Sequence, residues 1–195
     1  MVDVKTRYID IIEDESLNCI IEYPVIKTYE DNIFIKNINK KIYQDINIFK
    51  DISKEEVVYS NEKSTIFIDY ETHFNKNDII SISIVFSEIY KNNHIINYIN
   101  TYNYDLKNEK KILIEDIFNK NFNYKELITR YIKNQIQELT QDITFDLPFY
   151  ITSKYICINF SSYEVLNSSE IKNIKLYFRE IKEFLSDYTK KYLME

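Results

Sequence analysis

The sequence contains no glycine, no alanine and no tryptophan, and only two prolines among its 195 residues. Glycine lets a backbone take positive φ or come close to a phosphate group. The P-loop, the dinucleotide-binding turn and the nucleophile elbow of α/β-hydrolases all require glycine at fixed positions. Its absence excludes these three motifs and argues against the folds that depend on them.

Cysteine is almost as scarce. Cys19 and Cys157 lie far apart and form no C-x-x-C pair, which excludes a zinc ribbon and a thioredoxin-type redox motif. Both lie in apolar, strand-like runs, a setting typical of buried free thiols. A single disulfide between them is the alternative.

Long apolar runs are also missing. No stretch approaches about 18 consecutive apolar residues, so the sequence predicts no membrane-spanning segment. The first seven residues carry charges of both signs and lack the apolar core of a signal peptide. We therefore expect a cytoplasmic or spore-associated protein if Met1 is the native start, and an extracytoplasmic one if a signal or anchor was removed.

What the chain does contain is ordinary for a globular protein: 45% hydrophobic and 29% charged residues. The 25 Lys and Arg residues against 31 Asp and Glu residues give a net charge of −6. This balance argues against nucleic acid as a partner, because phosphate binding needs clustered cations. It favours a basic partner instead.

Alternation of apolar and polar residues in the middle of the chain predicts a sheet. Apolar side chains recur at every second position in 64–75, 79–90 and 94–104. Asn92 and Asn93 replace glycine in the turn between the last two segments, since asparagine tolerates the left-handed conformation. These segments are predicted to form an antiparallel meander.

Three amphipathic helices accompany the meander. Apolar residues at three- and four-residue spacing predict helices over about 32–51, from a cap at Asn123 onward, and at the C-terminus through Tyr177, Phe184 and Tyr188. The fold class is therefore α+β.

Further strands are expected at 17–26, 148–153 and 154–160. Pro24 indicates that the first of these is an edge strand or ends there. The acidic stretch 10–15 is expected to be a solvated turn. We divide the chain into a strand-helix subdomain at 1–60 and an α+β subdomain at 61–195, packed closely together.

Three polar residues at alternate positions are candidates for a metal-binding site. Asp69, Glu71 and His73 are spaced by two, so a strand would place both carboxylates and the imidazole on one face. This trio could bind a divalent metal and serve a metal-dependent hydrolase. The other interpretation, a solvated sheet face, is favoured because nothing nearby in the sequence completes a metal site.

Polar and aromatic residues around the predicted hairpin are candidate ligand contacts. His94 lies beside Asn92 and Asn93, and Tyr98 and Tyr102 follow on the next strand. Tyrosines in such positions can form a platform for a sugar or a protein, although half-buried sheet residues are the commoner case. No catalytic residue and no cofactor is predicted.

Two groups of segments resemble known families. Tyr23-Pro24-Val25-Ile26 and the helical Ile38-Asn39-Lys40-Lys41-Ile42 are similar to the start of the N-terminal domain of PdaC-type peptidoglycan deacetylases. The downstream half resembles the domain that follows it in the extracellular part of RsiV-type anti-sigma factors. The stretches that carry this second resemblance are Ser81 to Ile84, Asn103 to Ile112, Leu113 to Phe118, Phe149 to Thr152 and Phe160 to Val165.

The resemblance covers roughly residues 16 to 185 and departs from its pattern at two turns. Relatives carry a Gly-Gly-Ala-His-like hairpin where this chain has Lys91-Asn92-Asn93-His94, and Glu109 stands where glycine is common. The resemblance implies a non-catalytic α+β module that binds lysozyme in RsiV-type proteins and accompanies a catalytic domain in the deacetylases. We therefore expect a stand-alone binding or sensing module for a basic, lysozyme-like protein or a peptidoglycan fragment. The alternatives are a metal-dependent hydrolase and an intracellular or spore-associated structural protein.

Overall fold

The computed structural model describes residues 2–14, 16–27, 31–60, 63–90, 95–135, 147–161 and 171–194. It confirms the α+β class, with helices in the N-terminal, middle and C-terminal parts. Within these ranges, six strands form one sheet in the order β1-β2-β3-β4-β5-β6, and three form another in the order β7-β8-β9. The strands of the larger sheet are β1 (Asp3–Asp14), β2 (Leu17–Lys27), β3 (Ser64–Lys76), β4 (Ile79–Tyr90), β5 (Ile95–Asp105) and β6 (Lys110–Lys111).

The chain divides into two compact units. The first consists of Met1–Glu71 and Ile84–Tyr98, and the second of Thr72–Ser83 and Ile99–Glu195. Strands β3, β4 and β5 each contribute residues to both units. The boundary expected after residue 60 falls inside the first unit.

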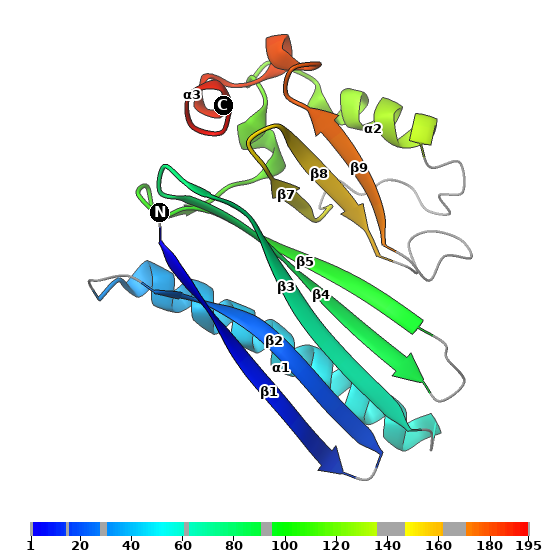
Figure 1. The fold of residues 1–195 in the computed structure, drawn as a ribbon. Coiled ribbons are helices and arrows are strands. Elements are labelled where there is room, and N and C mark those ends of the chain that lie inside the picture. Colours follow the sequence, from blue (N-terminus) through cyan, green and yellow to red (C-terminus); the bar gives the residue numbers. More distant parts are fainter. Residues whose placement is uncertain are drawn as a thin grey trace. The chain divides into compact units, whose positions relative to one another are not determined.

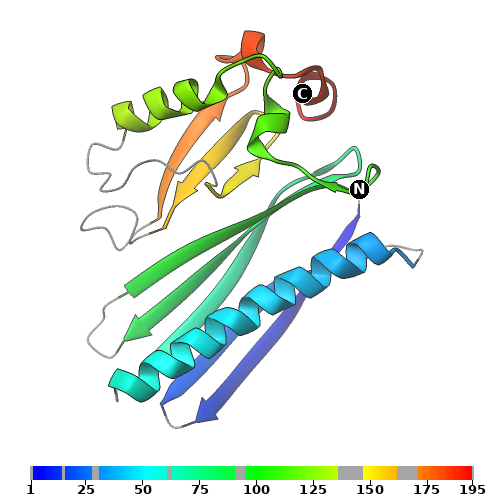
Figure 2. The ribbon, with the colours of Figure 1, turned by 180° about the vertical axis from the view of Figure 1, so that it is seen from behind.

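The first unit is built on a hairpin, a crossover helix and a parallel strand. β1 and β2 are antiparallel, and β2 pairs in parallel with β3 after the chain crosses over in helix α1 (Ile33–Ser60). Figures 1 and 2 show α1 lying along one face of these strands. Ile38, Ile42 and Ile46 recur at helical spacing and are buried, so the apolar stripe of α1 covers that face.

Two expectations for this unit are wrong. Residues 10–15 are not only a turn, because β1 runs to Asp14 and pairs with β2. β2 is consequently an inner strand, and Pro24 lies opposite Thr6 within the hairpin. The alternation in β1 is hidden in the sequence because both faces of this outermost strand are largely exposed and carry charges.

Helix α1 begins where expected and ends later. Asn32 caps it, since its Oδ1 accepts a hydrogen bond from the Ile35 backbone N–H at 2.9 Å. The helix continues about two and a half turns past the expected end near residue 51, to Ser60. Ser53 and Val57 are both buried and extend the stripe by helical spacing, which stabilises the added turns.

A buried carboxylate lies between α1 and the sheet. Glu88 of β4 is only 3% exposed and lies on the same face of the strand as the buried residues Ile84 and Phe86. Its Oε2 accepts a hydrogen bond from Ser53 Oγ at 2.9 Å, and its Oε1 accepts one from Ser64 Oγ at 2.7 Å. Both hydroxyls are buried, so the three side chains satisfy one another's hydrogen-bonding needs.

Within the described ranges, three residues have left-handed backbones. Asn77 and Asp78, with φ of 55° and 58°, form the tight turn between β3 and β4. Glu109, with φ of 50°, lies in the turn after β5, where the family resemblance leads one to expect glycine. A side chain at such a backbone costs energy that glycine avoids.

The substitution Glu109→Gly is therefore expected to raise the free energy of unfolding by about 1 kcal/mol. Urea unfolding followed by circular dichroism measures the change. Lys107→Gly, in the same turn but without a positive φ, is the matched control and should lower stability. A loss of stability with both variants would contradict the strain at Glu109.

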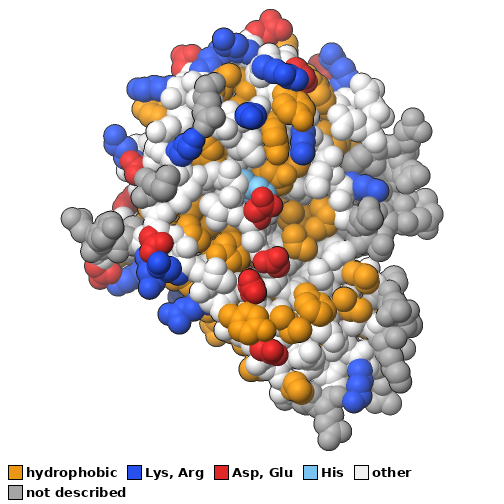
Figure 3. Space-filling view, in the orientation of Figure 1, with side chains coloured by type: hydrophobic (Ala, Val, Ile, Leu, Met, Phe, Trp, Pro, Cys, Tyr) orange, Lys and Arg blue, Asp and Glu red, His pale blue; other side chains and the backbone are white. Residues whose placement is uncertain are grey.

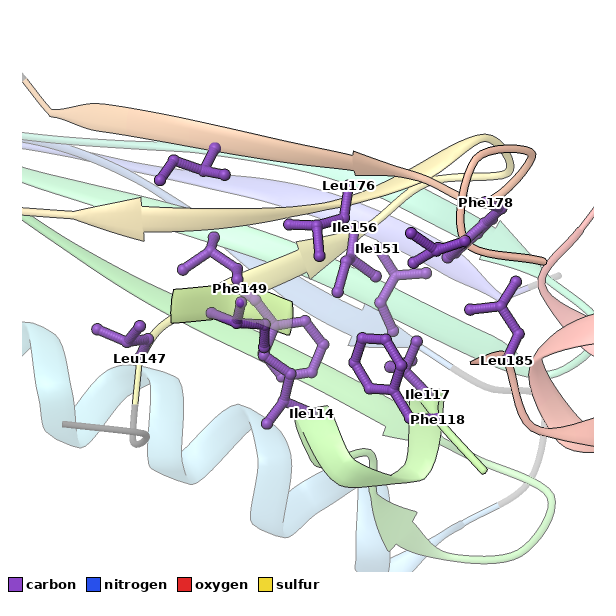
Figure 4. Packing of buried hydrophobic residues seen from close by; sticks show 14 of the residues in the cluster. Ile114, Ile117, Phe118, Leu147, Phe149, Ile151, Ile156, Leu176, Phe178 and Leu185 are labelled. Atoms are coloured by element: carbon purple, nitrogen blue, oxygen red, sulfur yellow. The ribbon is translucent and has the colours of Figure 1, made fainter. Parts of the chain in front are cut away.

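The second unit packs helices against one face of the smaller sheet. Its further elements are η1 (Ile114–Ile117), α2 (Tyr124–Gln135), β7 (Phe149–Ile151), β8 (Tyr155–Phe160), β9 (Lys172–Tyr177), η2 (Lys182–Phe184) and α3 (Asp187–Tyr192). Figure 4 shows the sheet residues Phe149, Ile151 and Ile156 pointing toward Ile117 and Phe118. All five belong to one buried hydrophobic cluster. The predicted cap of α2 is confirmed, because Asn123 Oδ1 accepts a hydrogen bond from the Glu126 backbone N–H at 3.4 Å.

The predicted C-terminal helix begins much later than expected. Lys172–Tyr177 forms β9, antiparallel to β8, and only the six residues of α3 are α-helical in this region. Ile174 and Leu176 are buried, whereas Lys175 between them is exposed, and this strand alternation overrides the helical spacing read from the sequence.

Three side chains form hydrogen bonds with the backbone of β7 along the edge that does not pair with β8. Asn103 Nδ2 donates to the Phe149 carbonyl at 2.6 Å, and Thr101 Oγ1 accepts from the Phe149 N–H at 3.1 Å. Ser81 Oγ accepts from the Ile151 N–H at 2.8 Å and donates to Asn103 Oδ1 at 2.6 Å. We call Ser81, Thr101 and Asn103 the β7 clasp; it satisfies backbone groups that an edge strand would otherwise leave open.

The turn after β5 is tied to the C-terminal helix. Asp105 accepts hydrogen bonds from the Asn108 backbone N–H and from the Tyr188 hydroxyl, both at 2.9 Å. Burial opposes ionisation of Asp105, but these bonds outweigh it and lower the pKa of its carboxyl. The stretch Asn103 to Ile112, which carries part of the family resemblance, thus has structural roles at both Asn103 and Asp105.

Candidate functional site

Three of the predicted contact residues cannot be placed. His94, Asn92 and Asn93 lie outside the described residues. Their predicted role in ligand binding stays a prediction.

The two predicted tyrosines of β5 pack inside the protein. Tyr102 is 4% exposed, so it offers almost no surface to a ligand, and the expected contact role is not supported for it. Tyr98 is half-buried, and its ring meets that of Phe49 edge-on at 5.8 Å. Tyr98 therefore contributes to packing under α1, the commoner of the two interpretations considered for it.

The metal alternative finds no support in the geometry. Across the described ranges, no three His, Cys, Asp or Glu side chains are grouped so that they could hold a metal ion. His73 Nε2 is within hydrogen-bond distance of Ser83 Oγ, at 2.8 Å, and its ring stacks on Tyr150 with centroids 3.6 Å apart. Asp69 and Glu71 are exposed residues of the first unit, whereas His73 belongs to the second.

A different surface gathers the carboxylates of the first unit. In the hairpin, Tyr8 lies opposite Glu22 and Asp10 opposite Ile20, and Ile20 pairs in turn with Phe67 of β3. Ile66 and Ile68 share the face of β3 on which Ser64 is joined through Glu88 to Ser53 of α1, and they pair with Cys19 and Ile21 of β2; all four are buried on this side. Because successive strand residues alternate between faces, Tyr8, Asp10, Ile20, Glu22 and Phe67 lie on the face opposite the helix.

We call this surface the acidic face and define it by its carboxylates Asp10, Glu22, Asp69 and Glu71. Figure 3 shows Asp and Glu side chains alternating with hydrophobic ones over β1, β2 and β3. The hydrophobic members include Tyr8, which is 59% exposed, and Ile12, which is 76% exposed. Large exposed apolar side chains beside charges of one sign are typical of a binding surface.

Three of the four carboxylates of this face have no salt-bridge partner among the described residues. Asp10, Glu22 and Asp69 form no ion pair with lysine or arginine in the part of the chain that the structure describes. Glu22 and Asp69 stand on adjacent strands, one step beyond the paired Ile21 and Ile68. Like charges at that spacing repel one another, so a cationic ligand would relieve an existing cost.

The carboxylates of the acidic face affect the pKa of the Tyr8 phenol. Its hydroxyl donates to Asp10 Oδ2 at 3.2 Å. Partial desolvation, together with the carboxylates of Asp10 and Glu22, raises the pKa of its phenol. The phenol stays neutral at physiological pH and can donate to or stack on a ligand.

The second unit exposes an aromatic surface of another kind. Tyr155 and Tyr177 are directly paired across β8 and β9, with ring centroids 5.4 Å apart, and Tyr150 lies 6.5 Å from Tyr155. We call Tyr150, Tyr155 and Tyr177 the tyrosine face. Lys175 lies over the Tyr155 ring at 5.0 Å and Arg179 over the Tyr177 ring at 5.5 Å. Hydrophobic side chains and cations accordingly alternate over β8 and β9 in Figure 3.

Neither cysteine acts as an exposed nucleophile. Cys19 and Cys157 are both free and buried, which agrees with the favoured expectation for them. Burial raises the pKa of the Cys157 thiol, which lies on the same side of β8 as Tyr155. The thiol is therefore protonated at neutral pH and contributes to packing.

Sequence reasoning missed both surfaces for the same reason. Tyr8, Glu22 and Asp69 come from three separate segments, as do Tyr150, Tyr155 and Tyr177. Two spacings in the sequence could have indicated these surfaces. Ile20 and Glu22 are two residues apart in β2, and Tyr155 and Cys157 are two residues apart in β8, so each pair shares one face of its strand. Recognising the acidic face also required strand β1, whose second half, from residue 10 onward, was expected to be a turn.

A family of unknown function matches part of the second unit. Residues 115–170 match the family described as "Protein of unknown function (DUF3298)". That segment includes α2, β7 and β8. No curated protein matches the chain.

Two solved structures share the fold over nearly the full length of both chains. A member of the DUF3298 family from Bacteroides fragilis NCTC 9343 gives a TM-score of 0.67 at 15% identity and covers 97% of this chain and 95% of that chain. A DUF3298 family protein from Pseudomonas aeruginosa PAO1 gives a TM-score of 0.66 at 7% identity, with 96% and 95% covered. At these identities the likeness establishes the fold and no activity.

The DUF3298 match supports the family resemblance at a coarser level than the PdaC-type and RsiV-type names. Those names stay predictions. None of the helices in the described ranges is both long and apolar enough to cross a membrane.

Proposed function

We propose that this chain is a non-catalytic binding module whose ligand is a basic protein of the lysozyme type. The observation that carries the proposal is the acidic face: four exposed carboxylates, Asp10, Glu22, Asp69 and Glu71, share one open sheet surface with Tyr8 and Ile12. A net charge of −6 adds long-range attraction for a cationic partner.

The chemistry of the face suits association with a protein. Lysine and arginine side chains of a partner can donate charge-assisted hydrogen bonds to the carboxylates. The exposed side chains of Tyr8 and Ile12 supply apolar area that excludes water around those bonds. The carboxylates steer encounter, and the apolar contacts slow dissociation.

Binding to a basic animal-type lysozyme on a biosensor tests the proposal. We expect saturable binding that persists at physiological salt and strengthens at low salt. The double variant Glu22→Gln with Asp69→Asn should weaken the affinity by about tenfold, since each removed charge contributes about 0.5 to 1 kcal/mol.

The matched control removes two carboxylates from the helix side of the same unit. Asp51→Asn with Glu55→Gln changes the net charge equally, and both residues are exposed on α1. It should bind as the unmodified chain does at physiological salt. Equal loss in both double variants would indicate nonspecific charge attraction, and no binding at all would refute the proposal.

A cell-wall glycan is the second candidate ligand, supported by the tyrosine face. Half-exposed aromatic rings can stack on sugar rings while their hydroxyls bond to sugar hydroxyls. Soluble peptidoglycan fragments should then bind the unmodified chain and lose binding in Tyr155→Ala, while lysozyme binding is unchanged. Fragment binding that survives Tyr155→Ala would contradict this use of the tyrosine face.

A further inference from the structure

One long edge of the larger sheet is open. β1 comes first in the strand order, so only β2 lies beside it among the described residues, as Figure 1 shows. It is 12 residues long, which corresponds to roughly 40 Å of backbone. An edge of this length presents a row of backbone N–H and C=O groups that another strand can pair with.

β1 exposes large apolar side chains, as expected of a strand that pairs with a further strand. Tyr8, Ile11 and Ile12 are exposed large hydrophobic residues, 59%, 39% and 76% exposed respectively. They lie on both faces of β1, since Ile11 faces the same side as the buried Cys19 and Tyr8 the same side as Glu22. An added strand would cover apolar area on both faces.

Charge along β1 is polarised. Lys5 and Arg7 lie in its first half, whereas Asp10, Glu13 and Asp14 lie in its second half. Asp3, the one acidic residue of the first half, is already paired with Lys5 at 3.1 Å. When two copies of such a strand run antiparallel, the basic half of each lies against the acidic half of the other, as a two-fold interface requires.

We propose that β1 pairs with β1 of a second copy of this chain, joining the two larger sheets edge to edge. The best register centres on Ile9 of both copies. It sets Tyr8 opposite Asp10, and Lys5 beside the acidic end at Glu13. The register centred on Tyr8 sets Asp3 opposite Glu13, and like charges directly opposite one another are destabilising.

This pairing also explains the charges on the edge. Lys5 and Arg7 discourage most strands from adding to β1, because a lysine or arginine on an edge must find a carboxylate or stay solvated. The acidic half of a second copy supplies carboxylates to this basic half, in addition to Asp3, which already pairs with Lys5. The dimer is therefore specific and does not continue into a fibre, since each copy has a single β1 edge to share.

A charge swap tests the pairing. Analytical ultracentrifugation of the full chain from micromolar to near-millimolar concentration should show a monomer–dimer equilibrium. Lys5→Glu with Arg7→Glu leaves only acidic charges on β1, and Asp10→Lys with Glu13→Lys gives it four basic residues against Asp3 and Asp14. Each double variant alone should raise the dimer dissociation constant at least about tenfold, whereas an equimolar mixture of the two should form a heterodimer.

The control carries the same charge change away from β1. Lys120→Glu with Lys133→Glu replaces two exposed lysines of the second unit and should dimerise normally. In the Ile9-centred register, Ile9→Cys should crosslink two copies under oxidation and Arg7→Cys should not, because its two copies are four residues apart. A monomer at every concentration, a dimer unaffected by the double variants, or crosslinking by Arg7→Cys instead of Ile9→Cys would overturn the proposal.

Discussion

Replacing Asn103 with leucine is expected to lower the free energy of unfolding by about 3 kcal/mol. The substitution keeps the approximate size of the side chain but removes an amide that bonds to the Phe149 carbonyl and to Ser81 Oγ. Both partners are then left with an unsatisfied group in a buried setting. Urea unfolding gives the total loss, and amide hydrogen exchange should show it first in β7.

The matched control lies on the same strand. Asn100 is an exposed residue of β5, and Asn100→Leu should change stability by no more than about 0.5 kcal/mol. Equal effects of the two substitutions would mean that the β7 clasp contributes little. Loss confined to Asn103→Leu would show that the β7 clasp stabilises the fold through the buried hydrogen bonds of Asn103.

The second large effect is expected at Glu88. Glu88→Met should lower the free energy of unfolding by about 3 kcal/mol, because the buried hydroxyls of Ser53 and Ser64 lose their acceptor. Removing the hydroxyls as well should restore part of the loss, since no unsatisfied donor then remains. The triple variant Glu88→Met with Ser53→Ala and Ser64→Ala is therefore predicted to be more stable than Glu88→Met alone.

Denaturant unfolding of the two variants decides between packing and hydrogen bonding. If the triple variant is less stable than the single one, the three side chains act through volume and not through their hydrogen bonds. If it recovers about half of the loss, the buried network is the dominant contribution of Glu88.

Much of the fold could be predicted because it depends on local periodicity. The strands that became β3 and β4 and the start of α1 show clear spacing of apolar residues, and each is found within one residue of its expected position. The cap at Asn123 was also readable, because it requires only a side chain at a fixed distance from Glu126.

The errors arose where tertiary contacts decide the structure. β1 carries charges on both faces because it is the outermost strand, so its alternation is not visible in the sequence. Tyr177 fits a helical stripe with Phe184 and Tyr188, but pairing with β8 makes it the end of strand β9. No role was predicted for Glu88, because its partners Ser53 and Ser64 are distant in sequence.

The candidate site was harder to predict than the fold. Its carboxylates come from β1, β2 and β3, so the acidic face exists only once register and pairing are known. The trio Asp69, Glu71 and His73 was correctly noted as alternating, but alternation says nothing about the neighbouring strands. Two of its members are part of the acidic face, and His73 instead stacks on Tyr150.

Carboxyl footprinting tests binding at the acidic face most directly. The chain would be labelled with a carbodiimide and an amine, with and without a saturating basic lysozyme, and each Asp and Glu measured by mass spectrometry. Asp10, Glu22, Asp69 and Glu71 should become protected, while Asp51 and Glu55 on the exposed side of α1 should label equally in both samples. Unchanged labelling of the four carboxylates in the complex would contradict the proposed binding surface.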